Sequence, residues 1–443
     1  MTSNAPPTSV DEGCPPSTLS QPRALAEWLQ YLESIHPAAI DLGLERIAAV
    51  WARLGASAES APIITVGGTN GKGSACAFLA AILNAAGYRV GLYTSPHLLS
   101  FTERIQICGE SIDEIRLCQI FAQIEVARGD ISLTYFEFGT LAAMLAFDDA
   151  NVDVVVLEVG LGGRLDAVNL FEPSCSVLVS VDLDHQAYLG NDRESIGYEK
   201  AGIFRSGVPA IMGDPAPPDS VTAYASQIGA PLQRIGVDFG FQRQENQWSF
   251  EGRHGKHLAL PFPALRGAYQ LANASVALAV LGELRERLPV GIGAIKQGLL
   301  AVEWPGRFQV LAGRPTVVLD VAHNPHAASS LRASLKSMAY HPTTFAVFSM
   351  LADKDIAGVV SELREEFDHW MVAGLAGPRG LTGDELAAQL TAGGCSGKVS
   401  VFADVAAAYQ AACNKAAEND RIVVFGSFHT VAEVMLARQR RGR

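Results

Sequence analysis

Two successive alternations of short apolar runs with stretches of helical periodicity constrain the fold of this chain most strongly. In the first alternation, the apolar runs are residues 63–66, 90–93, 152–158 and 177–181, with helical patterns such as 74–86 and 138–148 between them. In the second, they are residues 317–319, 345–348, 371–373, 399–402 and 422–425. Apolar strands that alternate with helices are typical of a mostly parallel sheet covered on both faces. We therefore predict an α/β protein with two doubly wound units, the second one smaller and Rossmann-like.

The division into domains follows from these alternations. A length of 443 residues suits two or three domains at about 150 residues each, and two are predicted. The predicted parts are a disordered tail at residues 1–23, a first domain at 24–304, a linker at 305–314 and a C-terminal domain at 315–443. Further predictions within the chain are two helices at 24–54 around a turn at 41–44, a small antiparallel patch at 226–257, a helix at 269–287 and turn formers at 303–315.

Composition excludes several classes of function. The formal net charge of −12 argues against a nucleic-acid partner, because such proteins neutralise phosphates with clustered Lys and Arg. No apolar run approaches the roughly 18 residues that cross a bilayer, and residues 1–23 lack the apolar core of a secretory signal. Seven cysteines without a CxxC pair suit neither a disulfide framework nor a zinc site. A cytoplasmic protein without a membrane segment is predicted.

A glycine-rich loop, Gly68-Thr69-Asn70-Gly71-Lys72-Gly73-Ser74, lies between the first predicted strand and the first predicted helix of the sheet. Such a turn suits phosphate, because the start of a helix presents unpaired N–H groups and the positive end of a dipole. The loop nearly matches the pattern GxxxxGK[ST], but Val66 occupies the first glycine position and Gly73 separates Lys72 from Ser74. A P-loop ATPase domain is predicted, and a plain strand-to-helix turn is the alternative.

Polar side chains follow several predicted strands, at the edge where sheets of this class bind ligands. Glu158 ends one strand, and Ser95-Pro96-His97 and Asp182-Leu183-Asp184-His185 follow two others. Magnesium prefers oxygen ligands, so Glu158, one hydroxyl and phosphate oxygens would suffice, unless Glu158 is a solvated loop residue. Asp320 can bind a ribose or cap a helix, and both interpretations stay open. Arg307 can reach a transferring phosphate or lie idle in the linker.

A combination of motifs spread over the chain from about residue 24 to its end resembles the folylpolyglutamate synthase and dihydrofolate synthase family, relatives of the Mur ligases. The motifs are the loop at 68–74, Thr94-Ser95-Pro96-His97-Leu98, the segment 158–166, Glu199-Lys200-Ala201-Gly202-Ile203, Pro305-Gly306-Arg307 and Asp320-Val321-Ala322-His323-Asn324-Pro325. The resemblance implies that ATP phosphorylates a pterin carboxylate and that the amine of L-glutamate attacks the acyl phosphate. The implied partners are ATP, L-glutamate, dihydropteroate and folates, bound by a monomer whose smaller domain is the glutamate ligase domain.

The resemblance also implies roles for individual residues. The implied magnesium ligands are Ser95, Glu158 and His185, with a second magnesium site beside a carbamylated Lys200 and with K⁺ as a further cofactor. The implied catalytic residues are Lys72, Lys200 and His323. The implied ATP-binding residues are Thr69, Asn70, Gly71, Lys72, Gly73, Asn273, Arg307 and Asp320. The implied pterin-binding residues are Asp41, Leu42, Thr134, Tyr135, Phe136, Glu137, Leu165, Asp166 and Ala167. One departure is Gln186-Ala187-Tyr188, where relatives often carry Thr, Asp and an aromatic residue.

Three alternatives to a bifunctional enzyme differ in what they demand of the chain. The choice between a bifunctional enzyme and a monofunctional folylpolyglutamate synthase rests on residues 40–46, which resemble the pterin-binding element of bacterial enzymes that carry both activities. A Mur-type peptidoglycan ligase normally has a whole sugar-nucleotide domain before the loop, and only about 65 residues precede it here. A nucleotide-dependent switch would need the loop alone and leaves the second domain unexplained.

Overall fold

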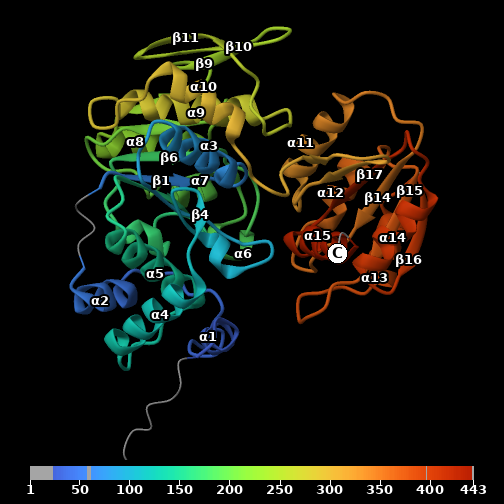
Figure 1. Ribbon diagram of the computed structural model, residues 1–443, viewed down its shortest axis with the longest axis horizontal. Coiled ribbons are helices and arrows are strands. Elements are labelled where there is room, and N and C mark those ends of the chain that lie inside the picture. The colour runs from blue at the N-terminus through green and yellow to red at the C-terminus, as the bar shows by residue number, and fades with distance from the viewer. Residues whose placement is uncertain (1–22, 57–60, 396, 442–443) are drawn as a thin grey trace, which may run out of the picture.

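The computed structural model describes residues 23–56, 61–395 and 397–441, so the predicted tail at 1–23 lies outside the described residues except for residue 23. The chain forms two α/β bodies side by side, one from its first two thirds and one from its last third (Figure 1). The predicted fold class, two mostly parallel sheets covered by helices, is confirmed. No helix within the described ranges is long and apolar enough to cross a membrane.

The first body is built on an eight-stranded sheet in the order β4-β3-β2-β5-β1-β6-β7-β8. The strands are β1 (Ile63–Gly67), β2 (Val90–Tyr93), β3 (Ile105–Ile107), β4 (Glu110–Ser111), β5 (Val154–Glu158), β6 (Cys175–Leu178), β7 (Ala210–Met212) and β8 (Leu232–Arg234). Strands β2 and β5 to β8 run parallel with β1, and β3 and β4 form an antiparallel edge. The central strands are buried on both faces, which explains why the sequence shows continuous apolar runs there.

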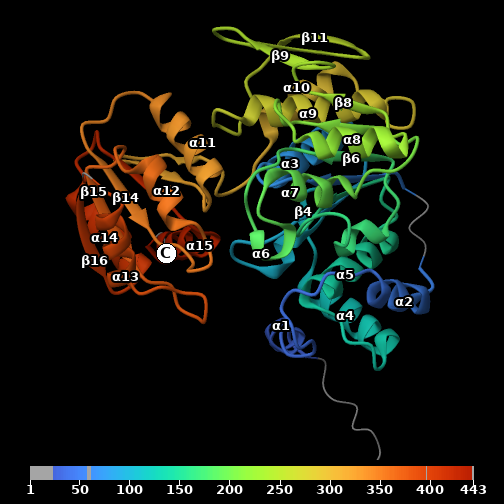
Figure 2. The same ribbon diagram turned by 180° about the vertical axis from the view of Figure 1, so that it is seen from behind.

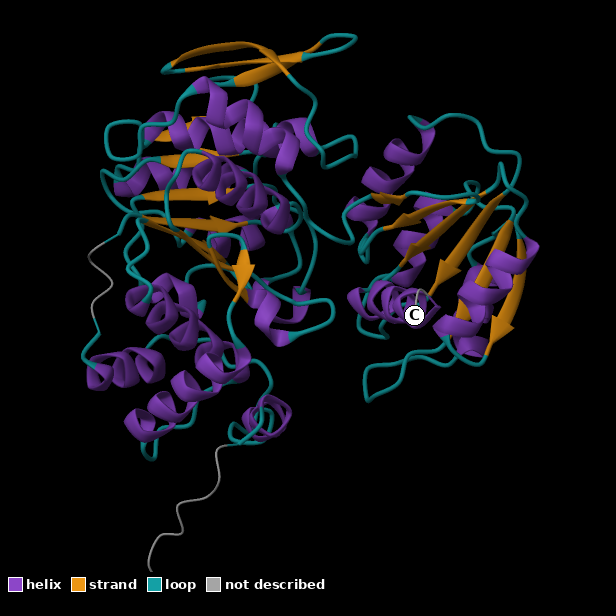
Figure 3. Ribbon diagram, viewed as in Figure 1, coloured by secondary structure: helices purple, strands orange, loops and turns teal. Residues whose placement is uncertain are grey.

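Helices cover both faces of this sheet (Figure 3). The face that contains Ile64 and Val66 packs against α3 (Lys72–Ala85), α9 (Gln270–Glu283) and α10 (Ile292–Ala301). The other face packs against α4 (Glu114–Arg128), α5 (Tyr135–Asp149), α7 (Arg193–Ala201) and α8 (Asp219–Ile228), with α1 (Leu25–Leu32) and α2 (Glu45–Leu54) outside α4 and α5. Shorter helical segments are η1 (Phe101–Arg104), η2 (Ala167–Leu170) and α6 (Gln186–Leu189).

A three-stranded antiparallel sheet lies outside α9 and α10, at the top of Figure 1. Its strands are β9 (Gly240–Arg243), β10 (Trp248–Gly252) and β11 (Gly255–Leu260). The antiparallel patch predicted for residues 226–257 is therefore present but begins later, because 219–228 form α8 and 232–234 extend the main sheet. Trp248 and Phe250 are buried against the α9 layer and hold the small sheet in place.

The second body has a six-stranded sheet in the order β12-β13-β17-β14-β15-β16. The strands are β12 (Gln309–Leu311), β13 (Thr316–Leu319), β14 (Thr344–Phe348), β15 (His369–Ala373), β16 (Lys398–Phe402) and β17 (Arg421–Phe425). Its helices are α11 (Pro325–Lys336), α12 (Ile356–Leu363) and α13 (Gly383–Ala392) on one face, and α14 (Val405–Lys415) and α15 (Phe428–Arg441) on the other (Figure 2).

The stretch predicted to be linker at 305–314 is not irregular throughout. Residues 309–311 form β12, which pairs antiparallel with β13. The chain turns back on itself directly after crossing between the bodies, so part of the linker belongs to the second sheet. The sequence did not indicate this strand, because three residues are too few to show an alternating pattern and turn-forming residues flank them on both sides.

Candidate active site

The glycine-rich loop connects β1 with α3 at the edge of the sheet. Gly68 and Gly71 have φ angles of +142° and +84°, a region that favours glycine. The N–H of Thr69 donates to the Ser180 carbonyl at 2.8 Å, and the N–H of Asn70 donates to the Ser180 hydroxyl at 3.0 Å. No side chain caps the start of α3, so its first N–H groups face the cavity as an anion site.

Two lysines meet at one carbonyl of this loop. Lys72 Nζ donates to the carbonyls of Gly68 at 3.1 Å and Thr69 at 3.3 Å, and Lys200 Nζ donates to the same Gly68 carbonyl at 3.1 Å. Lys200 is buried, and burial, reinforced by the charge of Lys72, lowers its pKa to about 7. A large fraction of Lys200 is therefore a neutral amine at neutral pH.

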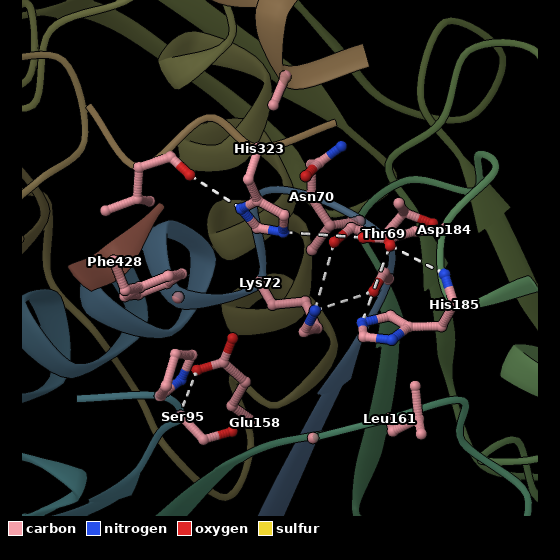
Figure 4. A pocket seen from close by; sticks show the side chains of 18 of the residues that line it. Thr69, Asn70, Lys72, Ser95, Glu158, Leu161, Asp184, His185, His323 and Phe428 are labelled. Carbon is pink, nitrogen blue, oxygen red and sulfur yellow. Dashed lines mark hydrogen bonds and ion pairs between the residues drawn. The ribbon is translucent and has the colours of Figure 1, made fainter. Parts of the chain in front are cut away.

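Glu158, the last residue of β5, points at the loop from below (Figure 4). It is only 4% exposed, and its Oε2 accepts a hydrogen bond from the Ser95 N–H at 3.0 Å. Burial raises the pKa of Glu158, and the charges of Lys72 and Arg307 oppose that rise. Because a buried carboxylate is costly without a cation, this position suits a metal ligand.

His185 lies on the opposite side of the loop, after β6 (Figure 4). Burial lowers the pKa of His185 to about 4, so its ring is neutral at pH 7, which is the form that binds metals. Three His, Cys, Asp or Glu side chains do not gather into a metal cage anywhere in the described part of the chain. A divalent ion at Glu158 and His185 would therefore need the Ser95 hydroxyl, phosphate oxygens or water as further ligands.

Polar contacts around Asp184 join the two bodies. Lys354 Nζ donates to Asp184 Oδ1 at 2.9 Å, Asn324 Nδ2 donates to Asp184 Oδ2 at 3.2 Å, and His323 Nε2 lies 3.8 Å from the same Oδ2. Asn324 also exchanges two amide hydrogen bonds of 3.2 Å with Asn70 of the loop. Burial alone would raise the pKa of Asp184, but His185, Lys354 and His323 together hold it well below its ordinary value.

Asp320 is the contribution of the second body's sheet to the site and directly follows β13. It is 4% exposed and accepts hydrogen bonds from the N–H groups of Phe308 and Ala322, both at 2.8 Å. Burial raises its pKa to about 6. The cap of α11 is Asn324, which accepts from the Ala327 N–H at 2.9 Å, so the interpretation of Asp320 as a helix cap is wrong. The guanidinium carbon of Arg307 lies 4.9 Å above the ring of Phe428.

A cavity of about 1410 Å³ unites these groups and is lined by residues of both bodies. All of the residues predicted to bind ATP or metal, or to act in catalysis, line it: Thr69, Asn70, Gly71, Lys72, Gly73, Ser95, Glu158, His185, Lys200, Asn273, Arg307, Asp320 and His323. Asp184 and Lys354 line it too, although sequence reasoning gave neither a role. Lys354 follows β14, so the rule that placed polar residues at strand ends could have found it.

The residues predicted to bind a pterin lie mostly outside the cavity wall. Of the nine residues predicted to bind a pterin, all within the described ranges, Tyr135 alone is among the residues that line this cavity. Thr134 and Glu137 form the capping box of α5. Asp166 accepts from the N–H groups of Leu161 at 2.8 Å and Val168 at 3.1 Å, and burial raises its pKa to about 7. The others, Asp41, Leu42, Phe136, Leu165 and Ala167, lie in the neighbouring segments.

Comparison with known proteins agrees with this architecture. Residues 66–281 match the family model "Mur ligase middle domain", and residues 306–428 match "Mur ligase, glutamate ligase domain". These matches assign the two bodies to the class of Mur ligases.

Whole-chain relatives narrow the class. The chain is 48% identical over 411 residues to the dihydrofolate synthase/folylpolyglutamate synthase of Escherichia coli strain K12, covering 93% of this chain and 94% of that relative. It belongs to the dihydrofolate synthase/folylpolyglutamate synthase family, which confirms the resemblance seen in the sequence. The Escherichia coli enzyme FolC in complex with DHPP and ADP superposes with a TM-score of 0.90 at 46% identity, over 95% of this chain and 99% of that one. A bifunctional folylpolyglutamate synthase/dihydrofolate synthase with Mn, AMPPNP and L-glutamate bound superposes with a TM-score of 0.86 at 48% identity, over 94% and 98%.

Proposed function

We propose that this protein is an ATP-dependent ligase that adds L-glutamate to dihydropteroate and to the γ-carboxylate of reduced folates. The observation that carries the proposal is the shared cavity, which brings Lys72 and Glu158 of one body together with Asp320 and His323 of the other. The relatives crystallised with DHPP and ADP, and with AMPPNP, Mn and L-glutamate, support the same set of ligands.

The first chemical step moves the γ-phosphoryl group of ATP to the substrate carboxylate. The two reactants are anions that repel each other, and a carboxylate reacts poorly with an amine until it becomes an acyl phosphate, a mixed anhydride with phosphate as its leaving group. Lys72 and the free N–H groups at the start of α3 offset that charge from one side of the cavity. On the other side of the cavity, which both residues line, Asp320 would hold the ribose and Arg307 the phosphates.

The second step joins the amine of L-glutamate to the acyl carbon and releases phosphate. The incoming ammonium must lose a proton before it can attack. His323 Nδ1 lies 2.8 Å from the Val321 carbonyl, so Nδ1 carries the hydrogen and Nε2 is left as an acceptor near Asp184. Burial lowers the pKa of His323 to about 4, so the ring is neutral at pH 7. We assign His323 to orienting the amine through Nε2, while the proton of the ammonium passes to water.

The donor set fits magnesium. Ser95, Glu158 and His185 would hold one ion, because Glu158 is a buried carboxylate without a cation ligand and His185 is neutral. Bound magnesium supplies positive charge to the phosphates. The neutral amine of Lys200 can add CO₂ and lose a proton, which forms an N–C bond and leaves a carbamate anion on a side chain that is ordinarily a cation. That anion would support the second magnesium, and a K⁺ site stays a prediction.

The pterin is proposed to lie beside Tyr135, in a site completed by Asp41, Leu42, Thr134, Phe136, Glu137, Leu165, Asp166 and Ala167. Tyr135 lines the same cavity as Lys72, so a pterin beside this ring would share the cavity with the phosphate-binding loop. We also propose that the protein is a monomer and that it works in the cytoplasm, where ATP is available.

Glutamate incorporation tests the proposed function. Purified protein with ATP, magnesium and radiolabelled L-glutamate would be given dihydropteroate, tetrahydrofolate or a UDP-muramyl peptide. Incorporation into both pterin acceptors is expected. Incorporation into tetrahydrofolate alone would indicate a monofunctional folylpolyglutamate synthase, and incorporation into neither pterin acceptor would refute the proposal.

A further inference from the structure

Arg104 is a cavity-lining arginine that the steps above do not use. Its carbonyl accepts from the Thr94 N–H at 2.9 Å, which ties its backbone to the end of β2. Its Nε donates to His97 Nδ1 at 2.9 Å, and its guanidinium carbon lies 5.1 Å from the ring centre of Phe101 and 5.3 Å from that of Tyr135. The side chain is thus held in one position by an imidazole and two aromatic rings.

The charge of Arg104 is not neutralised by its neighbours. Among the described residues, no carboxylate oxygen lies within 4.0 Å of its guanidinium. The adjacent Glu103 uses both oxygens on the backbone N–H groups of residues 98–100, each at 2.8 Å. The side-chain partner of Arg104, His97, is an imidazole that accepts a hydrogen bond from its Nε–H and supplies no negative charge. A half-buried, preorganised cation thus lines the cavity, and no described residue forms a hydrogen bond with its two terminal nitrogens.

Other arginines of the cavity wall differ in this respect. Arg193 is paired with Asp214 at 3.2 Å, and Arg379 is paired with Asp353 at 2.6 Å. Arg307 lies on the second body, over Phe428, where the nucleotide is proposed to bind. Arg104 instead contacts Tyr135, on the pterin side, and reaches through His97 to the loop that carries Ser95. With the pterin beside Tyr135, as proposed above, Arg104 lies along the path from the pterin to the loop that carries Ser95, where the carboxylate would react.

The two proposed acceptors differ along that path. In dihydropteroate the stretch between the pterin and the reacting carboxylate is a neutral aminobenzoyl group. In a folyl substrate the same stretch continues into glutamate, whose α-carboxylate precedes the reacting γ-carboxylate. We infer that Arg104 binds the α-carboxylate of the folyl substrate and so determines affinity for folates but not for dihydropteroate. This inference rests on the proposed function, because it concerns the acceptor of that reaction.

Arg104→Gln tests the inference, since glutamine keeps a polar side chain and removes the charge. The KM for tetrahydrofolate should rise about tenfold or more, as expected for loss of a charge-assisted hydrogen bond. The KM for dihydropteroate and both kcat values should stay within about threefold of wild type. Arg104→Lys should recover part of the folate affinity. Arg116→Gln, an exposed arginine outside the cavity that pairs with Asp149, is the control and should change neither KM.

A substrate change completes the test. A reduced folate analogue with γ-aminobutyrate in place of glutamate keeps the reacting carboxylate and lacks the α-carboxylate. The wild-type enzyme should bind this analogue about as weakly as Arg104→Gln binds tetrahydrofolate, and Arg104→Gln should not distinguish the two substrates. Equal loss with dihydropteroate and folate, no loss with either, or a wild-type enzyme that ignores the α-carboxylate would overturn the inference. Failure of the proposed function itself would appear separately, as a wild-type enzyme that incorporates no glutamate.

Discussion

Gly73, the residue that spoils the match of the loop to the common P-loop pattern, lies under the indole of Trp304. A Cβ atom at Gly73 would come within 2.7 Å of Trp304 Nε1 and 3.3 Å of Cε2. Trp304 immediately precedes Pro305-Gly306-Arg307, so the indole packs the start of α3 against the segment that carries Arg307. We predict that Gly73→Ala both destabilises the protein and weakens ATP use.

The magnitude follows from two opposing terms. Comfortable contact needs about 3.5 Å, so the new methyl group or the indole must move by about 0.8 Å. Overpacking of this kind costs about 1–3 kcal/mol, whereas alanine in a helix is about 1 kcal/mol better than glycine. The net loss in the free energy of unfolding should be about 0–2 kcal/mol. Displacement of the loop by that distance should lower kcat/KM for ATP by about tenfold or more.

Urea unfolding and ATP kinetics would measure both effects for Gly73→Ala, Trp304→Leu and the double variant. In the Trp304→Leu background the clash is gone, so Gly73→Ala should stabilise the protein by about 1 kcal/mol. Gly293→Ala is a matched control, because Gly293 lies in the first turn of α10 with no atom within 4 Å of its Cβ position. If Gly73→Ala stabilises the protein as much as Gly293→Ala does and leaves ATP kinetics unchanged, the reasoning is wrong.

Three further predictions concern the lysines of the cavity. Lys72→Met should reduce the rate of ADP formation by about a hundredfold or more, because the charge that offsets the phosphates is lost. The loss of two hydrogen bonds to loop carbonyls should lower the free energy of unfolding by no more than about 2 kcal/mol. Normal turnover would contradict the role of Lys72 in phosphoryl transfer. Lys354→Met should lower the free energy of unfolding by about 3 kcal/mol, because it leaves the carboxylate of Asp184, whose side chain is 12% exposed, without its cation. Lys336→Met is the control in the same chemical unfolding experiment. The Lys336 side chain is 64% exposed, so this change should cost under about 1 kcal/mol. Lys200 has a folded pKa of about 7, below its unfolded value, so the unfolded chain binds more protons between pH 7 and about 10 and wild-type stability should rise with pH across that window. In CO₂-free buffer, where the Lys200 amine stays unmodified, Lys200→Met should remove this rise in unfolding free energy measured from pH 6 to pH 10. An unchanged slope would show that Lys200 is not buried as a neutral amine.

Much of the fold was predictable from the sequence because it depends on local patterns. The buried strands of both sheets show as continuous apolar runs, since helices cover both faces. Parallel strands deliver their carboxyl ends to one edge, so the chain positions of Ser95, Glu158 and His185 sufficed to predict that they share a site. The edge strand β12 escaped prediction, because its pairing with β13 is a tertiary contact.

The sequence by itself determined the class of this protein: a nucleotide loop, a row of polar strand ends and a second α/β unit, all legible in residue type and spacing. Only the tertiary structure decided which groups meet across the bodies. The Asp184–Lys354 contact joins residues 170 positions apart, the packing of Trp304 on Gly73 spans most of the first body, and the unpaired charge of Arg104 depends on where Glu103 directs its oxygens. These features are set by distances between side chains on different elements, and a linear sequence does not encode such distances in any local pattern.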